Sequence, residues 1–292
     1  MKRLAALRRS IAVAAAAVFV LAACGGGAAP SSPTAAATFE SSSYMAKIQA
    51  AGKIRIGTRE DNVPFGKKNP ATNKFEGFDP DIARELAKAI FGNQGDIDAK
   101  IEWVAVVSAT RIPTLQENKA DLVIATFTIN EERKKQIDFS DSYFNTGQRI
   151  LVKKDNTAIK EAADLNGKRV CAARGSTSEK NISTKAPQAT LELQDTYANC
   201  LILLQQGRVD AISTDEAILF GLTKQDPNTK VVGATFSDEP YGIGVKKNEG
   251  NDRAGFVRFV NGELKKMIDD GRWAAIYKQW LTPLFGDERK KP

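Results

Sequence analysis

The order of strand-like and helix-like segments restricts the fold of this 292-residue chain more than any other feature. Residues 53–58 alternate polar and apolar side chains, which is typical of a half-buried strand. A helix is then expected from Asp79-Pro80 to Gly92, with Asp79 as its N-cap, because these residue types favour helix starts and ends. Further strands are expected at 101–104, 121–125, 149–153, 169–173, 191–194, 210–213 and 241–245, with helical segments between most of them. This alternation predicts parallel βαβ units and an α/β fold.

The strand and helix pattern runs once before residue 148 and again after it, with a similar rhythm. We therefore expect two α/β lobes rather than one long sheet. The segment 164–168 is rich in turn residues and leads into the second lobe. Two amphipathic helices follow the strand at 241–245, and the sequence does not indicate which lobe they join.

The first 24 residues have the composition of a secretory leader. Four basic residues precede an apolar run at 11–20, which is too short to cross a bilayer comfortably. The Leu-Ala-Ala-Cys that follows resembles the bacterial lipobox, which implies cleavage before Cys24 and a lipid anchor on its thiol. We expect a signal peptide at 1–23, a flexible tether at 24–40, and an exported protein that is held at the outer face of the cell membrane or in the periplasm. The alternative is a plain signal peptide with an incidental Cys24.

Composition excludes several classes of chemistry. The chain contains no histidine, which rules out histidine-dependent triads, histidine metal sites and imidazole pH switches. Four of the 42 basic residues lie in the predicted leader, which leaves 38 against 35 acidic residues, a surplus of +3. This surplus is too small to indicate a nucleic-acid partner. We expect no metal and no cofactor.

Two cysteines, Cys171 and Cys200, remain once Cys24 is assigned to the lipid anchor. Exported proteins fold in an oxidising compartment, where a pair of cysteines usually joins. A disulfide is therefore expected, and it would stabilise the fold by roughly 3 kcal/mol on the chain-entropy model. The alternative is two buried free thiols.

Seven short segments together resemble the periplasmic amino-acid-binding proteins of ABC importers, over nearly the whole mature chain. These segments are Val63-Pro64-Phe65, Glu76-Gly77-Phe78-Asp79, Arg111-Ile112-Pro113, the run from Asp121 to Arg133, Phe139-Ser140-Asp141, Gly175-Ser176-Thr177 and Thr214-Asp215. The resemblance implies the two-lobe periplasmic-binding-protein fold of type II, in which each lobe is a mostly parallel sheet flanked by helices.

The resemblance also implies how the chain is divided between the lobes. Lobe 1 is expected at 45–146 and 241–292, and lobe 2 at 147–240. Two hinge strands would cross between them near 146–150 and 236–241, and the lobes would close around the ligand.

The resemblance implies a site that pairs each charge of a free amino acid, because burying those charges without partners is costly. In such a site, Arg133 binds the α-carboxylate with its two parallel donors and Asp215 accepts from the α-ammonium. Phe65 and Phe127 flank the ligand. The alternative for Arg133 is a solvated residue in the charged run 131–135. The full set of ligand-binding residues expected on this basis is Arg59, Phe65, Ser108, Arg111, Thr126, Phe127, Thr128, Arg133, Ser176, Thr177, Tyr197 and Asp215.

Side-chain specificity depends on Arg59 and Arg111. Thr58-Arg59-Glu60 resembles the glutamate/aspartate-binding branch of the family, in which this arginine and the Arg111 equivalent meet the side-chain carboxylate of the ligand. Two cations at one pocket favour a second carboxylate and disfavour a cationic ligand. Asn62 departs from the family pattern, since several relatives place an aromatic residue there. The alternative for Arg59 is a surface residue paired with Glu60 or Asp61.

The sequence thus predicts a monomeric solute-binding protein that captures glutamate or aspartate, with glutamine and asparagine as further candidates, and delivers it to an ABC transporter permease. One alternative is a ligand-sensing subunit of a membrane receptor. Another is a fold relative with dehydratase activity, but no group for general acid or base catalysis can be identified, so we expect no enzyme.

Overall fold

The computed structural model describes residues 36–248, 253–286 and 292, all within a compact unit that covers residues 33–292. The predicted signal peptide at 1–23, the predicted lipidation site Cys24 and the first part of the predicted tether lie outside the described residues. Within the described part of the chain, no helix has both the length and the apolar character needed to cross a membrane.

The first sheet has five strands in the order β5-β1-β6-β15-β7. They are β1 (Ile54–Thr58), β5 (Ile101–Ala105), β6 (Leu122–Val123), β7 (Ile137–Phe139) and β15 (Gly244–Lys246). β1 pairs in parallel with β5 and β6, whereas β15 is antiparallel to β6 and β7. The helices that pack on this sheet or on one another are α1 (Tyr44–Ala51), α2 (Phe78–Phe91), η1 (Ile97–Lys100), α3 (Arg111–Gln116), α4 (Glu131–Lys134), α8 (Arg253–Asp269) and α9 (Arg272–Trp280).

The second sheet also has five strands, in the order β11-β10-β12-β9-β13. They are β9 (Gln148–Lys153), β10 (Arg169–Ala173), β11 (Thr190–Gln194), β12 (Ala211–Asp215) and β13 (Thr229–Val232). β10 is parallel to β11 and β12, and β9 is antiparallel to β12 and β13. Its helices are η2 (Ala162–Leu165), α5 (Thr177–Lys185), α6 (Tyr197–Gln205) and α7 (Glu216–Gln225). A disulfide joins Cys171 of β10 to Cys200 of α6, with their Cα atoms 5.6 Å apart.

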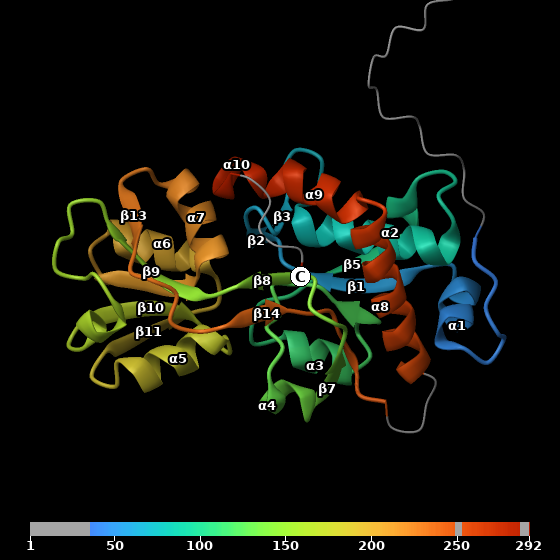
Figure 1. Ribbon diagram of the computed structural model, residues 1–292, viewed down its shortest axis with the longest axis horizontal. Helices are drawn as coiled ribbons and strands as arrows, with labels where there is room; N and C mark the ends of the chain where they lie inside the picture. The colour runs from blue at the N-terminus through green and yellow to red at the C-terminus, as the bar shows by residue number, and fades with distance from the viewer. Residues whose placement is uncertain (1–35, 249–252, 287–291) are drawn as a thin grey trace, which may run out of the picture. The chain divides into compact units, whose positions relative to one another are not determined.

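Shorter elements lie between and beside the two sheets (Figure 1). β8 (Phe144–Thr146) and β14 (Glu239–Tyr241) pair antiparallel and connect the halves of the unit. The other elements are the three-stranded sheet of β2 (Asp61–Asn62), β3 (Gly66–Lys68) and β4 (Phe75–Glu76), and the C-terminal helix α10 (Thr282–Phe285). The predicted α/β fold with two sheet-containing lobes is confirmed. The residue boundaries of the lobes and the positions of the hinges stay predictions.

The start of α2 differs from the prediction. The N-cap is Gly77 rather than Asp79, and the helix begins at Phe78. Gly77 has φ of 136°, and a Cβ there would lie 2.4 Å from the carbonyl oxygen of Phe65, so only glycine fits this turn. Asp79 lies in the first turn, where its carboxylate binds groups outside the helix. The sequence pattern identified the helix but not the task of its acidic residue.

The region predicted as one strand at 241–245 contains the ends of two strands. β14 ends at Tyr241 and β15 begins at Gly244, because the chain leaves the pair with β8 there and joins the first sheet. The helices α8 and α9 that follow pack into the core of the first sheet, which answers the question that the sequence left open. The strand predicted at 121–125 is shorter, since β6 covers only Leu122–Val123.

Candidate functional site

Three arginines gather where the two halves of the unit meet. Arg59 directly follows β1, Arg111 begins α3, and Arg133 lies in α4. All three are buried, with 0%, 2% and 8% of their surface exposed. Burial lowers the pKa of Arg111 well below its usual value, and the charges of Arg133 and Arg59 lower it further. These three cations are therefore close enough to repel one another, and they need anionic partners.

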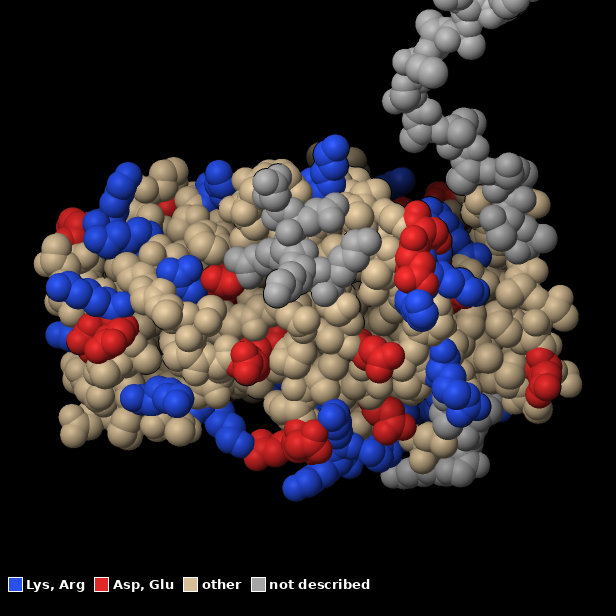
Figure 2. Space-filling view, viewed as in Figure 1, with Lys and Arg blue, Asp and Glu red and all other residues tan. Residues whose placement is uncertain are grey.

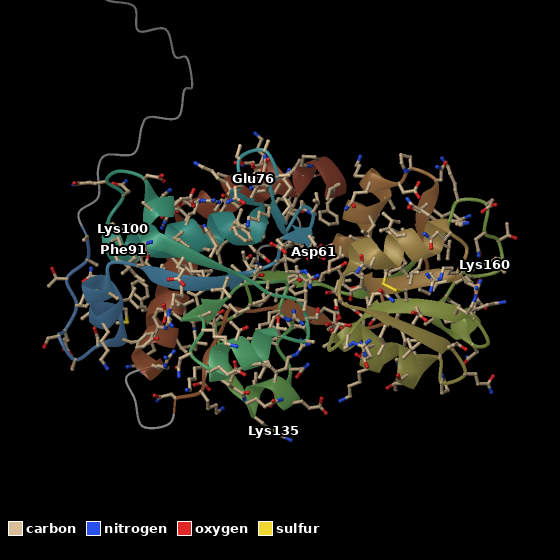
Figure 3. The ribbon with its side chains drawn as sticks, turned by 180° about the vertical axis from the view of Figure 1, so that it is seen from behind. Asp61, Glu76, Phe91, Lys100, Lys135 and Lys160 are labelled. Atoms are coloured by element: carbon tan, nitrogen blue, oxygen red, sulfur yellow. A yellow bond between two sulfur atoms is a disulfide. The ribbon has the colours of Figure 1, made fainter. Side chains whose placement is uncertain are left out.

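The guanidinium group of Arg59 donates hydrogen bonds to acceptors within the protein. Its Nη2 and Nε donate to the carboxylate of Asp61 at 3.0 and 3.2 Å, and its Nη1 donates to Ser108 Oγ at 3.3 Å. Pairing with Asp61 was the alternative that the sequence left open, but the arginine is buried rather than on the surface. Figure 3 marks Asp61 between the two sheets.

Arg111 supports the loop that follows β6. Its Nη1 donates to the carbonyl oxygens of Ala125 at 3.0 Å and Thr126 at 2.8 Å, and its Nε donates to that of Ser108 at 3.3 Å. Among the described residues, these bonds leave Nη2 of Arg111 without a protein acceptor. One guanidinium nitrogen is thus available to a ligand oxygen.

Arg133 is buried although it belongs to a charged run. Its Nη1 donates to the carbonyl oxygen of Thr128 at 2.8 Å, and its Nη2 donates to that of Gly175 at 3.3 Å. Its neighbours Glu132 and Lys134 are exposed. Burial lowers the pKa of Arg133, while nearby acidic groups raise it. Arg133 is therefore not a solvated residue, and its role in binding the α-carboxylate stays a prediction.

The two aromatic residues predicted for the site, Phe65 and Phe127, both pack against other side chains of the protein. The guanidinium groups of Arg111 and Arg133 lie 4.3 and 5.1 Å from the ring centre of Phe127. Phe65 packs at ring-centre distances of 5.3 to 5.9 Å against three other aromatic residues of the first core, which are Phe78, Phe144 and Tyr241. Phe127 thus supports two arginines, and contact of either ring with a ligand stays a prediction.

Asp215 ends β12 and contributes a buried carboxylate. Its Oδ2 accepts a hydrogen bond from the hydroxyl of Tyr241 at 2.6 Å. Its Oδ1 has no hydrogen-bond partner among the described residues. Burial and the neighbouring Glu239 raise the pKa of Asp215 to about 8. An unpaired buried acceptor costs about 1–3 kcal/mol, so a donor from a ligand is expected at Oδ1.

Hydroxyl groups at the start of α5 and α6 are already bonded within the protein. Ser176 is the N-cap of α5 and accepts from the backbone N–H of Glu179. Thr177 donates to Glu239 at 2.7 Å, and the hydroxyl of Tyr197 donates to that of Ser178 at 3.4 Å. These residues lie near the site, but the structure shows structural tasks for their hydroxyls.

Sequence reasoning missed Glu239 and Tyr241. Glu239 of β14 is buried and accepts from Thr177, from Asn181 at 2.9 Å and from Ser237 at 2.7 Å. Its charge acts on Asp215 and Arg133. The segment around these residues was predicted as a hinge, and an acidic residue within it was the one signal that could have pointed to them.

The loop after β6 holds Thr126 and Thr128 next to the arginines. Thr126 has φ of 45°, a conformation that threonine rarely adopts. Its backbone N–H donates to Asp79 at 2.9 Å, and its hydroxyl accepts from Asn62 at 3.4 Å. Thr128 accepts from Arg133 through its carbonyl, as described above. Within the described residues, no group of three potential ligand side chains could hold a metal ion.

Side chains and backbone of the two halves touch at several places around the site. Glu132 of α4 pairs with Lys180 of α5 at 2.6 Å. Figure 2 shows that acidic and basic side chains lie together along the lower edge of the view. Gly221 of α7 approaches the loop before β3, and a Cβ there would lie 1.9 Å from the carbonyl oxygen of Val63. The site residues are thus enclosed by both halves.

Comparisons with known proteins identify the family. Residues 54–283 match the bacterial extracellular solute-binding proteins, family 3. The ABC transporter glutamine-binding protein GlnH of Bacillus subtilis is 44% identical over 238 residues, which cover 81% of this chain and 84% of that protein. The glutamate-binding protein GluB of Corynebacterium glutamicum is 35% identical over 246 residues, which cover 81% of this chain and 80% of that protein.

A solved structure extends these similarities to the fold. An ancestral arginine-binding protein bound to glutamine is 41% identical, with a TM-score of 0.71, and the match covers 79% of this chain and 98% of that one. The fold is the periplasmic-binding-protein fold of type II, as predicted. Family members act outside the cytoplasm with ABC transporters and are not enzymes. The chain is therefore a solute-binding protein for amino acids and belongs to the bacterial extracellular solute-binding proteins, family 3.

Proposed function

We propose that this protein captures an acidic amino acid, with glutamate as the main ligand, and delivers it to an ABC importer. The observation that carries this proposal is the gathering of three buried arginines beside a carboxylate oxygen that no group in the described part of the chain meets with a hydrogen bond. A free amino acid brings both the anion and the ammonium that these groups require. The oxygen Oδ1 of Asp215, which has no hydrogen-bond partner among the described residues, is the natural acceptor for the ammonium.

The α-carboxylate is assigned to Arg133, and the ligand side chain is assigned to Arg59 and Arg111. Arg133 bridges the two halves through Thr128 and Gly175. Nη2 of Arg111 meets no protein acceptor within the described ranges, so it can donate to the ligand side chain. Charge-assisted bonds from guanidinium groups to a carboxylate are stronger than bonds between neutral groups. In this proposal, the α-ammonium of the ligand points toward Asp215.

The charge balance of the site residues favours an acidic ligand side chain. Asp61 and Glu239 compensate two of the three arginines, Asp61 as the ion-pair partner of Arg59 and Glu239 through its charge near Arg133. Burial raises the pKa of Asp79 to about 7 and that of Asp215 to about 8, so both carboxyl groups are only partly ionised near neutral pH. The buried groups thus carry a positive surplus that a ligand with net charge −1 neutralises.

Glutamine is the second candidate, and one observation favours it. The Nε and Nη2 groups of Arg59 already donate to Asp61, which leaves fewer donors for a side-chain carboxylate of the ligand. The relatives named above include a glutamine-binding protein, and the solved structure contains glutamine. An amide needs no charge compensation.

Calorimetric titration of the ligand-stripped protein with glutamate, aspartate, glutamine, asparagine and arginine tests the proposal. Glutamate is expected to bind at micromolar Kd or tighter, about −8 kcal/mol, and arginine not to bind. An Arg59→Gln variant is expected to lose at least about tenfold in glutamate affinity and to keep its glutamine affinity. Arg169→Gln, which removes an exposed arginine paired with Asp210, is the control. Binding of glutamine without glutamate by the parent protein would contradict the acidic assignment.

A lipid anchor on Cys24 is part of the same proposal, since Cys24 follows an apolar leader in a lipobox-like context. Cells that express the full chain are expected to incorporate labelled palmitate into the protein. The Cys24→Ser variant is expected to remain unlabelled. Equal labelling of both would contradict anchoring at this residue.

A further inference from the structure

Asp79 is a fully buried carboxylate that the proposed ligand contacts do not use. It lies in the first turn of α2, and none of its surface is exposed. Its Oδ1 accepts from the hydroxyl of Tyr143 at 2.8 Å, and its Oδ2 accepts from the backbone N–H of Thr126 at 2.9 Å. Both oxygens therefore have protein donors, and neither is left for a ligand.

The bond to Thr126 ties Asp79 to the geometry of the site. Thr126 adopts φ of 45°, and such a backbone persists only where its surroundings hold it. Asp79 holds the N–H of this residue, Arg111 holds its carbonyl oxygen at 2.8 Å, and Asn62 donates to its hydroxyl at 3.4 Å. A displacement of Asp79 would therefore move Thr126 and, through it, Arg111.

Asp79 also acts on the arginines through its charge. Arg59 and Arg111 both stabilise its ionised form, which opposes the effect of burial on its pKa. It forms an ion pair with neither of them among the described residues. The carboxylate thus lies behind the two arginines that the proposed function assigns to the ligand side chain, and its field is weakly screened because the region is buried.

We propose that Asp79 is a positioning residue that sets how strongly the site prefers a carboxylate over an amide in the ligand side chain. Its negative charge compensates Arg59 and Arg111 from behind and so limits their attraction for glutamate relative to glutamine. This inference rests on the proposed function, because it requires the ligand side chain to lie near these arginines.

The isosteric variant Asp79→Asn tests the proposal. Its amide oxygen can accept from Thr126, and its amide nitrogen can donate to the hydroxyl oxygen of Tyr143, so the change removes a charge and retains both contacts. The quantity to measure at pH 8.5 is the ratio of the glutamine Kd to the glutamate Kd. This ratio is expected to rise by about fivefold to tenfold in the variant.

Asp81→Asn is the matched control. Asp81 lies two residues further along α2, and its carboxylate binds Arg84 and Trp280 instead of site residues. The control removes the same charge from the same helix and is expected to leave the ratio unchanged.

A pH series separates the electrostatic role from a merely structural one. Burial raises the pKa of Asp79 to about 7, so the parent ratio is expected to rise toward the Asp79→Asn ratio as the pH falls from 8.5 to 5.5. The groups that face Asp79 are the guanidinium groups of Arg59 and Arg111, a residue type that stays protonated in proteins, and the hydroxyl of Tyr143, whose pKa is raised well above its usual value. Glutamate stays ionised throughout. Asp215 titrates as well, and its charge also acts on Arg111, so the same pH series in Asp79→Asn measures the part of the change that belongs to Asp215.

Each result decides between the two proposals. A ratio that is the same in Asp79→Asn and the parent at pH 8.5, with normal glutamate binding, overturns the role of Asp79 and leaves the proposed function intact. If the variant does not fold, the parent series decides, and a ratio that stays flat from pH 8.5 to 5.5 overturns the inference. Failure of the parent to bind glutamate and glutamine overturns both.

Discussion

At the scale of single residues, the site contains more buried charge than its neighbours compensate. Arg59 and Asp61 are two residues apart and form a pair in which the arginine side chain is 1% exposed and the aspartate side chain 17% exposed. Removal of one partner from such a pair leaves an uncompensated buried charge, which is strongly destabilising. The buried Arg59 therefore depends on Asp61 for charge compensation, and a bound anion can supply part of that compensation.

The variant Asp61→Asn is expected to unfold at a lower temperature than the parent when no ligand is present. Saturating glutamate is expected to restore more of the lost stability than saturating glutamine, because only glutamate has a side-chain carboxylate that can compensate Arg59. Thermal unfolding with and without each ligand measures this difference. Equal recovery by the two ligands would show that Arg59 does not face the ligand side chain.

The pH dependence of stability follows from Asp215. Its pKa in the folded, ligand-free protein is raised to about 8, compared with about 3.9 in an unfolded chain. The folded state therefore binds more protons, and the contribution of Asp215 to stability falls as the pH rises from about 4 to about 8. Asp79, with a pKa raised to about 7, acts in the same direction.

Urea unfolding of the ligand-free protein between pH 5 and pH 8 is expected to show a decrease in the free energy of unfolding. The variant Asp215→Asn is expected to lose part of that decrease and to bind amino acids at least about a hundredfold more weakly, since its side chain has no negative charge for the ammonium. A slope that is identical in the parent and the variant would mean that Asp215 keeps its ordinary pKa.

At the scale of elements, local pattern identified most strands and helices, whereas their precise ends depend on distant residues. The helix at α2 and the strands β1, β10 and β12 follow from periodicity and from helix-start residues. The break between β14 and β15 does not follow from local pattern. It occurs because β14 pairs with β8 and β15 pairs with β6, and both partners are far away in the sequence. The role of Asp79 could not be predicted from local pattern either, because its carboxylate oxygens accept from Thr126 and Tyr143, which are 47 and 64 residues away.

The site itself was predictable in part. The family-like segments pointed to Arg59, Arg111 and Arg133, and the structure brings these three together. Glu239 could not be assigned from the sequence, because its importance arises from three donors that meet it only in the folded chain. The pairing of the Arg59 guanidinium with Asp61 stayed an alternative for the same reason. The sequence alone does not show whether an arginine donates to a neighbouring residue or to a ligand.

The disulfide in the second sheet connects β10 to α6 across 29 residues of sequence. Closing a loop of this length is expected to stabilise the folded protein by about 3–4 kcal/mol on the chain-entropy model. Denaturant unfolding of the oxidised protein and of the double variant Cys171→Ser, Cys200→Ser measures this difference. Equal midpoints with equal slopes would contradict a stabilising role for the bridge.

At the scale of the whole described unit, the two halves contact each other through an ion pair, an aromatic pair and a close backbone approach. Lys180 pairs with Glu132, and Phe220 of α7 lies with its ring centre 5.4 Å from that of Phe285 in α10. The exposed ion pair contributes little by itself. The approach of Gly221 to the carbonyl of Val63 is the most restrictive contact, because no side chain fits there.

The variant Gly221→Ala is therefore expected to keep the two halves apart without unfolding either sheet. Its ligand affinity is expected to fall by about tenfold or more, and small-angle scattering is expected to show no compaction with saturating ligand. Gly262→Ala is the control, since a Cβ at Gly262 in α8 meets nothing within 4 Å. Parent-like affinity of Gly221→Ala would mean that the ligand does not require this approach.

The pairing of β8 with β14 has a consequence for how the binding specificity of such a protein can evolve. Thr146 lies opposite Glu239 in this ladder, so the segment that builds the second sheet starts and finishes at neighbouring points. A segment with adjacent ends can be replaced by a homologous one with little disturbance to the rest of the chain. A single recombination event can therefore exchange Asp215 and the start of α5 together, and leave the three arginines in place.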